Sequence, residues 1–504
     1  MRQLRKENGF TLAEVLGVIV ILSVLVIILI PPIANQIIKS KNEISKATLQ
    51  LIYSATESYM TKKQNEYPIY NGNVYCIQLQ DLVDNNELKA PIKDIKIGKE
   101  IDLANVVKVS ITNIANIDYE IIKSENCEAI DRRFPALKLV EGMIPIYWDS
   151  NNVVRKADIN NAEGAHQWYD YDEQMWANVV LVTESTRNAY INATPGTEII
   201  EDDVLAYLVW IPRYRYKLFN VESAIIDPQE IEIEFEDRNV TKSNGSENGE
   251  WLTHPAFTFG DEELNGFWVG KFETTGDATT PTIKPGVSAL RSENISTQFA
   301  TAKKFNNVST YGLSSDADAH MMKNMEWGAV AYLSHSKYGK NNEIEINSNK
   351  NYYTGGGSSN AYITNIGQST TGNVYGVYDM SGGAYEYVMG GMYNSDGTTI
   401  RLGSSGFVQA TIDGTEMEKY IDKYAYGTSS SDYTRRKLGD ATGETRGWYS
   451  DFASFVRSSG PWFRRGGNYS SGTTAGAFTF SIGSGTSLSD DGFRLAVPGV
   501  LLPA

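Results

Sequence analysis

The strongest constraint on this chain is a long apolar run close to its amino terminus. Residues 10–30 are mostly Val, Ile and Leu, and residues 15–38 carry no charged side chain. At about 1.5 Å per residue, a helix of this length extends about 30 Å, the thickness of a bilayer's hydrocarbon core. The nine residues before the run, MRQLRKENG, are polar and basic. We therefore expect one membrane-spanning helix.

The junction between the basic segment and the apolar run reads GFTLAE, residues 9–14. This word closely resembles the prepilin motif, in which a dedicated peptidase cuts after Gly and methylates the new terminal Phe amine. The resemblance implies a leader of residues 1–9, removed between Gly9 and Phe10. An ordinary secretory signal is instead cleaved after its apolar part. A plain signal anchor remains the alternative.

Glu14 lies inside the apolar run, where a carboxylate is costly and therefore a candidate for function. The prepilin resemblance implies that Glu14 meets the free N-terminal amine of a neighbouring subunit during assembly. Pro31 and Pro32 should kink the helix at the end of the apolar run. We expect residues 10–63 to form one kinked helix, whose first half serves membrane and fibre core.

The second half of that helix should pack on a globular head. Ile44, Ala47, Leu51 and Ala55 recur at spacings of three or four residues, which indicates one apolar face. Strand-like alternation follows in residues 74–82, 95–97, 106–111 and 119–122. Residues 64–135 are therefore predicted to form a small sheet against the helix.

Only two cysteines occur in the chain, Cys76 and Cys127, and both belong to this predicted head. In an exported protein they could form one disulfide bridge. Two unpaired buried thiols remain the alternative, because spacing in sequence does not fix the separation of two Cα atoms.

The length and net charge of the chain restrict its domain number and its class of partner. A chain of 504 residues favours two or three separately cored units. A net charge of −16 argues against a nucleic-acid partner, which clustered Lys and Arg would have to attract. From residue 137 the composition shifts towards Trp, Tyr, Asn and Gly. We interpret residues 136–203 as an aromatic-rich connecting segment of a C-terminal head, and residues 204–504 as the main domain of that head.

Five words in this last region occur in a fixed order: GFWVGKFETT at 266–275, MKNMEWGAVAYLS at 322–334, NVYGVYDMSGGAYEYVMG at 373–390, RRGGNY at 464–469 and DGFRLAV at 491–497. Together they resemble the formylglycine-generating, sulfatase-modifying family. The resemblance covers residues 204–497 and implies an irregular variant of the C-type lectin fold. The fold class expected for the whole chain is α+β: a long pilin helix with a small sheet head, followed by this lectin-like domain.

The residues of these motifs favour a structural role over a catalytic one. Large rings such as Trp268 and Trp327 more often fill a core than hold a cofactor. Arg494 is expected to pair with a buried acid such as Asp379 or Glu386, in a structural role.

Enzymes of that family bind copper through cysteines in this domain, and this chain has no cysteine after Cys127. The four histidines, His166, His254, His320 and His335, show no metal-ligand spacing. The family can also bind calcium near the word that here contains Gly383 in place of the commoner Asn. We expect a protein that is not an enzyme and has no cofactor, with calcium left as an open possibility.

Residues 468–491 resemble the variable region of proteins from diversity-generating retroelements, which precedes a GFR word, here at 492–494. In this interpretation small polar side chains contact the ligand. Phe478 and Phe480 should point inward, and the residues alternating with them outward. An ordinary Ser/Gly-rich loop remains the alternative. The predicted contact residues are Asn468, Ser470, Ser471, Thr473, Thr474, Thr479, Ser481, Ser484, Thr486, Ser487, Ser489, Asp490 and Asp491.

Taken together, these features predict a type IV pilin-like surface adhesin, a minor or tip subunit on a bacterial pilus, anchored by a single membrane pass before assembly. The resemblances imply other pilin subunits, the prepilin peptidase and an unidentified surface ligand, protein or glycan, as partners. A structural pilin or secretion pseudopilin without ligand binding is the alternative, and a formylglycine-generating type of enzyme is less favoured.

Overall fold

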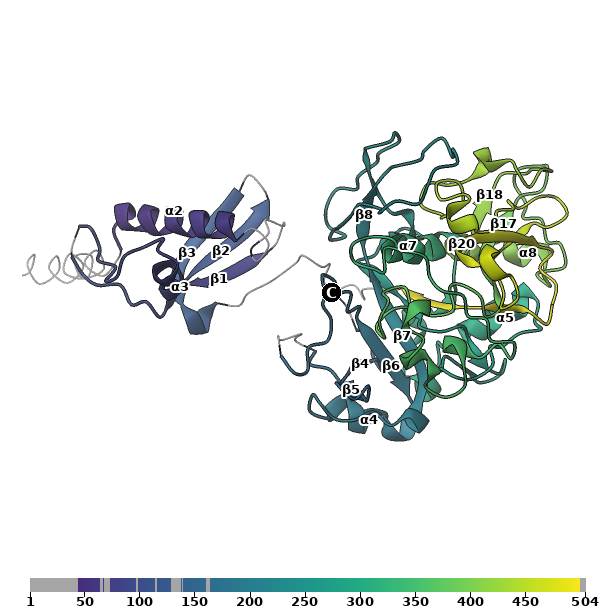
Figure 1. Cartoon of the computed structure of the whole chain (residues 1–504), viewed down its shortest axis with the longest axis horizontal. Coiled ribbons are helices and arrows are strands. Elements are labelled where there is room, and N and C mark those ends of the chain that lie inside the picture. The colour runs from purple at the N-terminus through teal and green to yellow at the C-terminus, as the bar shows by residue number, and fades with distance from the viewer. Residues whose placement is uncertain are drawn as a thin grey trace, which may run out of the picture. The chain divides into compact units, whose positions relative to one another are not determined.

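The computed structural model describes residues 44–63, 67, 73–96, 98–113, 116–127, 137, 139–159 and 164–498. Predictions for the leader, Gly9, Phe10, Glu14 and the first part of the long helix therefore lie outside the described residues. Among the residues that are described, no helix has the length and apolar character needed to cross a membrane. The chain divides into two compact units, Met1–Arg133 and Phe134–Ala504, each with its own apolar core (Figure 1).

In the first unit a helix lies along one face of a small sheet (Figure 1). The helix is α2 (Lys46–Lys62), and the sheet has the antiparallel order β1-β2-β3. Ile52, Ala55 and Tyr59 of α2 are buried against the sheet. The strands and the second helix are β1 (Val74–Gln78), α3 (Leu79–Asp84), β2 (Asn105–Asn113) and β3 (Asn116–Lys123).

Three details of the sequence prediction for this unit are wrong. Residues 95 and 96, which the prediction places in a strand, form a turn. Ala47 and Leu51 are exposed, because the buried face of α2 runs through Thr48, Ile52, Ala55 and Tyr59. The run 74–82 is not one strand: it changes into α3 at Leu79, so that Leu79 and Leu82 enter the core at helical spacing. The predicted runs 106–111 and 119–122 do lie within β2 and β3.

Cys76 of β1 and Cys127, which follows a 3-10 turn at Ser124–Asn126, form a disulfide with a Cα–Cα distance of 6.0 Å. The bridge links the edge strand β1 to the segment that leaves β3.

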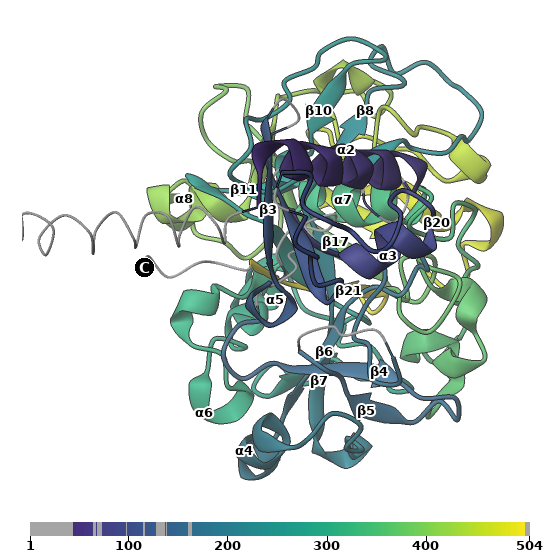
Figure 2. The ribbon, with the colours of Figure 1, turned by 90° about the vertical axis from the view of Figure 1, so that its left-hand side faces the viewer.

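The second unit is built on a seven-stranded antiparallel sheet of order β16-β22-β13-β7-β6-β4-β5. Residues of the expected connecting segment supply three of these strands, β4, β5 and β6. Figures 1 and 2 show β4 to β7 side by side, with α4 (Glu184–Asn192) next to them. The strands are β4 (Ile144–Trp148), β5 (Val154–Lys156), β6 (Asn178–Val182), β7 (Val204–Pro212), β13 (Gly266–Gly270), β16 (His320–Met321) and β22 (Leu495–Pro498).

A second sheet has the order β18-β17-β19-β20, with β21 pairing parallel to β17. The helix α7 (Asn324–Ser334) contacts both β7 of the first sheet and β17 of the second, and all of its residues are buried. It therefore holds the two sheets on one core. The strands are β17 (Tyr385–Met392), β18 (Asp422–Tyr424), β19 (Trp462–Gly466), β20 (Gly476–Gly483) and β21 (Asp491–Phe493).

Shorter elements complete the unit. Three small sheets pair as β10-β8-β9, β11-β12 and β14-β15. Their strands are β8 (Tyr214–Lys217), β9 (Ile233–Phe235), β10 (Trp251–Thr253), β11 (Thr258–Phe259), β12 (Glu262–Glu263), β14 (Thr275–Gly276) and β15 (Pro281–Thr282); the short helices are α5 (Ile295–Lys303), α6 (Val308–Tyr311) and α8 (Gln409–Ile412). The described chain is thus a mixed α and β protein dominated by sheets.

A buried ion pair ties this core together. Arg494 and Glu386 have no exposed surface, and two guanidinium nitrogens of Arg494 lie 2.5 and 3.0 Å from the two Glu386 oxygens. The remaining Arg494 donors reach the carbonyls of Gly270 and Tyr378 at 2.8 and 2.9 Å. The predicted structural pairing of Arg494 with a buried acid is confirmed, and Trp268 and Trp327 are buried as expected.

Candidate functional site

The segment predicted to contact a ligand runs from the end of β19, through β20, to the start of β21. A short 3-10 turn, Gly472–Thr474, precedes β20, and a loop at residues 484–490 follows it. β20 pairs antiparallel with β19, and β21 pairs parallel with β17, so both ends of the segment are anchored in one sheet. The two turns on either side of β20 carry the segment's exposed surface.

The predicted residues fall into three groups by exposure. The first group is exposed to solvent, and the second is half-buried. The first group is Ser470, Thr473, Thr474, Ser487 and Ser489; the second is Ser471, Ser484, Thr486 and Asp490. These nine residues are available to a ligand.

The other four, Asn468, Thr479, Ser481 and Asp491, are buried, and for these the prediction of a solvent-facing side chain is wrong. Alternation along β20 predicts outward residues only where one face of the sheet is open. β20 is the last strand in the order of its sheet, but another segment lies along its edge away from β19, where Phe480 exchanges hydrogen bonds with Phe452 and Ser454. In addition, the Thr479 hydroxyl donates to the carbonyl of Thr474 at 2.7 Å, so the preceding turn folds over this part of the strand.

Buried Asn468 connects the two exposed turns. Its side-chain nitrogen donates to Asp490 Oδ2 at 3.1 Å, and its Oδ1 accepts from the Ser470 backbone N–H at 3.1 Å. Ser471 Oγ donates to the same oxygen at 3.2 Å. Residues 470–471 and 490 are therefore brought together, although about twenty positions separate them in sequence. Asn468 organises this surface rather than presenting its own side chain.

Asp491 has a similar internal role. Its Oδ1 lies 3.1 Å from Arg464 Nη1, and burial raises the pKa of its carboxyl to about 6, against the opposing effect of Arg464. The Arg464 guanidinium also lies 4.4 Å from the ring centroid of Tyr385, whose hydroxyl is 3.4 Å from Ser471 Oγ. The Arg464 guanidinium and the Tyr385 ring therefore support the turn that contains Ser471.

Sequence reasoning missed several large side chains beside these turns. The rings of Tyr352 and Tyr469 meet edge to face with centroids 4.9 Å apart, and the Arg291 guanidinium lies 3.8 Å from the Tyr352 centroid. Arg291 also donates to the carbonyl of Ser489. Phe452, half exposed at 50%, bonds through its backbone N–H to Thr474. Only Tyr469 is close in sequence, so no local signal pointed to Arg291 or Tyr352.

In the motif that resembles a calcium-binding block, one oxygen of Asp379 is used in hydrogen bonds within the protein and the other, Oδ2, is buried without a hydrogen-bond partner. Asp379 Oδ1 accepts from Asn347 Nδ2 at 2.9 Å and from the Gly355 N–H at 2.8 Å. A Cβ added at Gly383 would lie 2.4 Å from Glu273 Oε1, so that carboxylate fills the place of a longer side chain. Among the described residues, no group of three or more His, Cys, Asp or Glu side chains could hold a metal ion.

The four histidines are dispersed. His254, His320 and His335 are buried, and His166 is half-buried in a different part of the unit. His254 packs against the rings of Tyr214 and Phe257 in tilted and edge-to-face contacts, and burial lowers its pKa to about 3.

Comparison with known proteins gives one family match and several distant structural similarities. A family model described as the prokaryotic N-terminal methylation motif matches residues 4–30. No curated protein is similar enough in sequence to count as a relative.

Among solved structures, the chain is similar to "Major Tropism Determinant M1 Variant", with 11% identity, a TM-score of 0.25, and coverage of 80% of this chain and 83% of that chain. The "U1 Variant" of the same protein gives 11% identity, a TM-score of 0.23, and coverage of 79% and 82%. "Treponema denticola variable protein 1" gives 13% identity, a TM-score of 0.22, and coverage of 58% and 95%. TM-scores this low do not establish a common fold.

Proposed function

We propose that this chain is a pilin-type adhesin of the bacterial cell surface, in which the second unit binds an external ligand. The ligand would contact a surface that we call the turn face: residues 470–474 and 484–490, together with Tyr352, Phe452 and Tyr469. The observation that carries the proposal is the Asn468–Asp490 hydrogen bond, which joins two exposed polar turns into one surface.

The turn face has the composition expected of an adaptable binding surface. Ser, Thr and Gly supply small hydrogen-bonding groups, whereas Tyr and Phe rings supply large rigid contact areas at a low entropic cost. Beneath it lies a fixed support, because the Arg494–Glu386 pair and the strands β17, β19 and β20 are buried. Loops held on a rigid sheet are a common location for binding residues.

The N-terminal methylation motif supplies the other half of the proposal. In this account the leader is removed between Gly9 and Phe10, Glu14 meets the amine of a neighbouring subunit, and the chain enters a pilus with other pilin subunits. The second unit spans Phe134–Ala504, a large load for every subunit of a densely packed fibre. A minor or tip position is therefore proposed, and the proposed role includes no catalytic step.

The test replaces exposed turn-face residues with Gln, which is neutral and longer. One variant carries five such changes, at Ser470, Thr473, Thr474, Ser487 and Ser489. The matched control carries five Gln changes at other exposed loop positions: Thr279, Ser395, Thr398, Ser429 and Ser431. We expect the producing cells to lose adhesion with the first variant and to keep it with the control, at equal pilus number and equal thermal stability.

Unchanged adhesion in the turn-face variant, with normal piliation, would contradict ligand binding by this face and favour the structural-subunit alternative. Abundance in sheared pili adds a second criterion, since a minor or tip subunit should be scarce beside the main pilin.

A further inference from the structure

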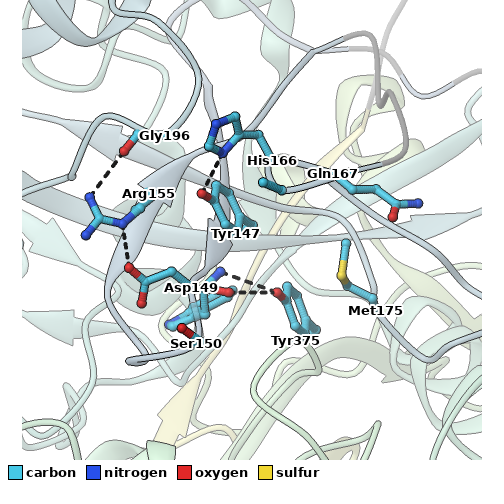
Figure 3. A pocket seen from close by; sticks show the side chains of 12 residues that line it. Tyr147, Asp149, Ser150, Arg155, His166, Gln167, Met175, Gly196 and Tyr375 are labelled. Carbon is cyan, nitrogen blue, oxygen red and sulfur yellow. Dashed lines mark hydrogen bonds and ion pairs between the residues drawn. The ribbon is translucent and has the colours of Figure 1, made fainter.

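A cavity of about 580 Å³ lies on the second unit, on residues that the turn face does not use (Figure 3). Its lining comes from the end of β4, from β5, from the segment at residues 164–167, and from Tyr375 of a distant loop. This volume is within the range of pockets that hold small organic molecules. None of the lining residues lies within residues 468–491.

Aromatic rings form one part of the lining. Trp148 and Tyr147 are adjacent residues of β4, and both are buried, with 6% and 7% of their surface exposed. The Tyr375 ring meets Trp148 edge to face at a centroid distance of 5.2 Å, and its hydroxyl lies 3.4 Å from the Trp148 backbone nitrogen and oxygen. These contacts fix the rings in position before any ligand arrives.

The charged side chains of the lining, Asp149 and Arg155, are also held in position by hydrogen bonds. The Arg155 Nε donates to Asp149 Oδ2 at 2.5 Å, and Arg155 Nη1 donates to the Gly196 carbonyl at 3.2 Å (Figure 3). Asp149 Oδ1 accepts from the backbone N–H groups of Asn151 and Val153 at 2.8 and 3.0 Å. The carboxylate and guanidinium are thus oriented by the fold rather than by a ligand.

His166 and Tyr147 form a second polar pair, with 2.8 Å between His166 Nδ1 and the Tyr147 hydroxyl. Burial raises the pKa of Tyr147, so its hydroxyl stays protonated at neutral pH. Gly196 makes room for the imidazole, because a Cβ at this position would stand 2.7 Å from His166 Cε1. A larger residue there would displace the ring.

The lining favours an uncharged ligand. Among the described residues that form it, Asp149 and Arg155 are the only Asp, Glu, Lys or Arg side chains, and their charges are paired. An anion or a cation entering the cavity would find no unpaired opposite charge. A neutral ligand with both hydroxyl groups and an apolar face would match the fixed polar groups and the ring edges.

We propose that this cavity binds one neutral sugar ring, such as a hexose or an N-acetylhexosamine, at the end of a glycan. Hydroxyl groups of the sugar would bond to His166, Asp149 and Arg155, and its C–H face would pack on Tyr147 and Tyr375. This site goes beyond the turn face and does not depend on it.

The test uses the full chain in a detergent that has no sugar headgroup. Saturation-transfer NMR and calorimetry would probe glucose, galactose, mannose and N-acetylglucosamine, with N-acetylneuraminic acid as the charged comparison. We expect at least one neutral sugar to bind with a Kd of about 1–10 mM, the weak range of a small ligand with few hydrogen bonds, and the charged sugar not to bind.

Two variants place that binding in the cavity. Ser150→Trp introduces a bulky ring from an exposed lining position and should abolish binding. His166→Ala removes one hydrogen-bonding group and should raise Kd about tenfold. Ser395→Trp, on an exposed loop that belongs to neither the cavity nor the turn face, is the matched control and should leave Kd unchanged.

Circular dichroism and Tm would establish that each variant is folded. The proposal is overturned if no neutral sugar binds, if the charged sugar binds better, or if folded Ser150→Trp binds as well as the wild type.

Discussion

At the scale of single residues, Arg494 forms a fully buried ion pair within the core of the second unit. It has no exposed surface, and its partners are Glu386 and two backbone carbonyls from different parts of the chain. Removing one member of a buried pair leaves the other charge without compensation. We expect Arg494→Ala to lower the free energy of unfolding by about 3–5 kcal/mol, measured by urea denaturation of the second unit's transition.

Arg215 provides the matched control, because it pairs with Glu234 at 2.6 Å but both side chains are more than a third exposed. Arg215→Ala should cost less than about 1 kcal/mol. Equal losses in the two variants would show that burial of the Arg494 pair does not determine its importance.

Asp451 carries a prediction about pH. It is buried beneath β20, where its Oδ2 accepts from the Phe478 N–H at 3.0 Å, and burial raises its pKa to about 7. An unfolded chain returns this carboxyl to a pKa of about 4. The proton is therefore held more tightly in the folded state, and the stability that it contributes is lost as pH rises through 7.

Asp451→Asn cannot titrate, so the comparison isolates this one carboxyl from the histidines and other acids. Between pH 6 and pH 8, we expect the free energy of unfolding of the wild type to fall relative to that of the variant. A difference that stays constant across these two pH values would contradict the assignment.

Residue identity alone predicted some of these contacts and not others. Arg494 was assigned to a buried acid because it follows Gly492 and Phe493 in a recognisable word. Arg291 and Tyr352 could not be assigned to the turn face, since they lie far from it in sequence and reach it only through the fold. A single sequence does not contain that information.

At the scale of elements, the predicted contact residues within β20 are buried, whereas those in the turn before it are exposed or half-buried. Thr479 has 1% of its surface exposed, whereas Thr474, in the turn before it, is exposed. We expect Thr479→Lys to lower Tm clearly, because it buries an unpaired charge. Thr474→Lys should leave Tm nearly unchanged. Thermal denaturation of both variants is the measurement, and similar Tm values for the two would show that β20 is open on this face.

The Cys76–Cys127 disulfide links two elements of the first unit. It closes a loop with a sequence separation of 51 residues between β1 and the end of β3. For a loop of this length, the chain-entropy model gives a stabilisation of about 4 kcal/mol. The double variant Cys76→Ser, Cys127→Ser should destabilise the first unit by this order and leave the second unit's unfolding transition in place. Equal shifts in both transitions would contradict two separately cored units.

Element boundaries were predictable where the pattern was continuous and failed where it changed. The apolar alternation of residues 106–111 correctly indicated a strand. The run 74–82 looked similar, yet it turns helical at Leu79, and periodicity over nine residues does not separate these outcomes. Along β20 the predicted alternation of buried and exposed side chains is wrong, because Thr479 and Ser481 are buried like Phe478 and Phe480. A segment distant in sequence contributes to this burial, since Phe452 and Ser454 exchange hydrogen bonds with Phe480.

At the scale of the whole molecule, composition indicated a second region from residue 137 onward, and the second compact unit begins at Phe134. What composition could not show is that residues 136–203 belong to the main sheet. This segment supplies three strands, of which β6 pairs with β7, β4 with β6 and β5 with β4, a pairing that only the folded sheet reveals.

The central claim concerns the whole molecule: a pilin-type N-terminus carries this second unit to the cell surface. The most direct measurement is mass spectrometry of the N-terminal peptide from the chain recovered in sheared surface fibres. We predict a peptide that begins at Phe10 and carries one methyl group on its amine. A chain that begins at Met1, or that stays wholly with the cell membrane after shearing, would contradict the claim.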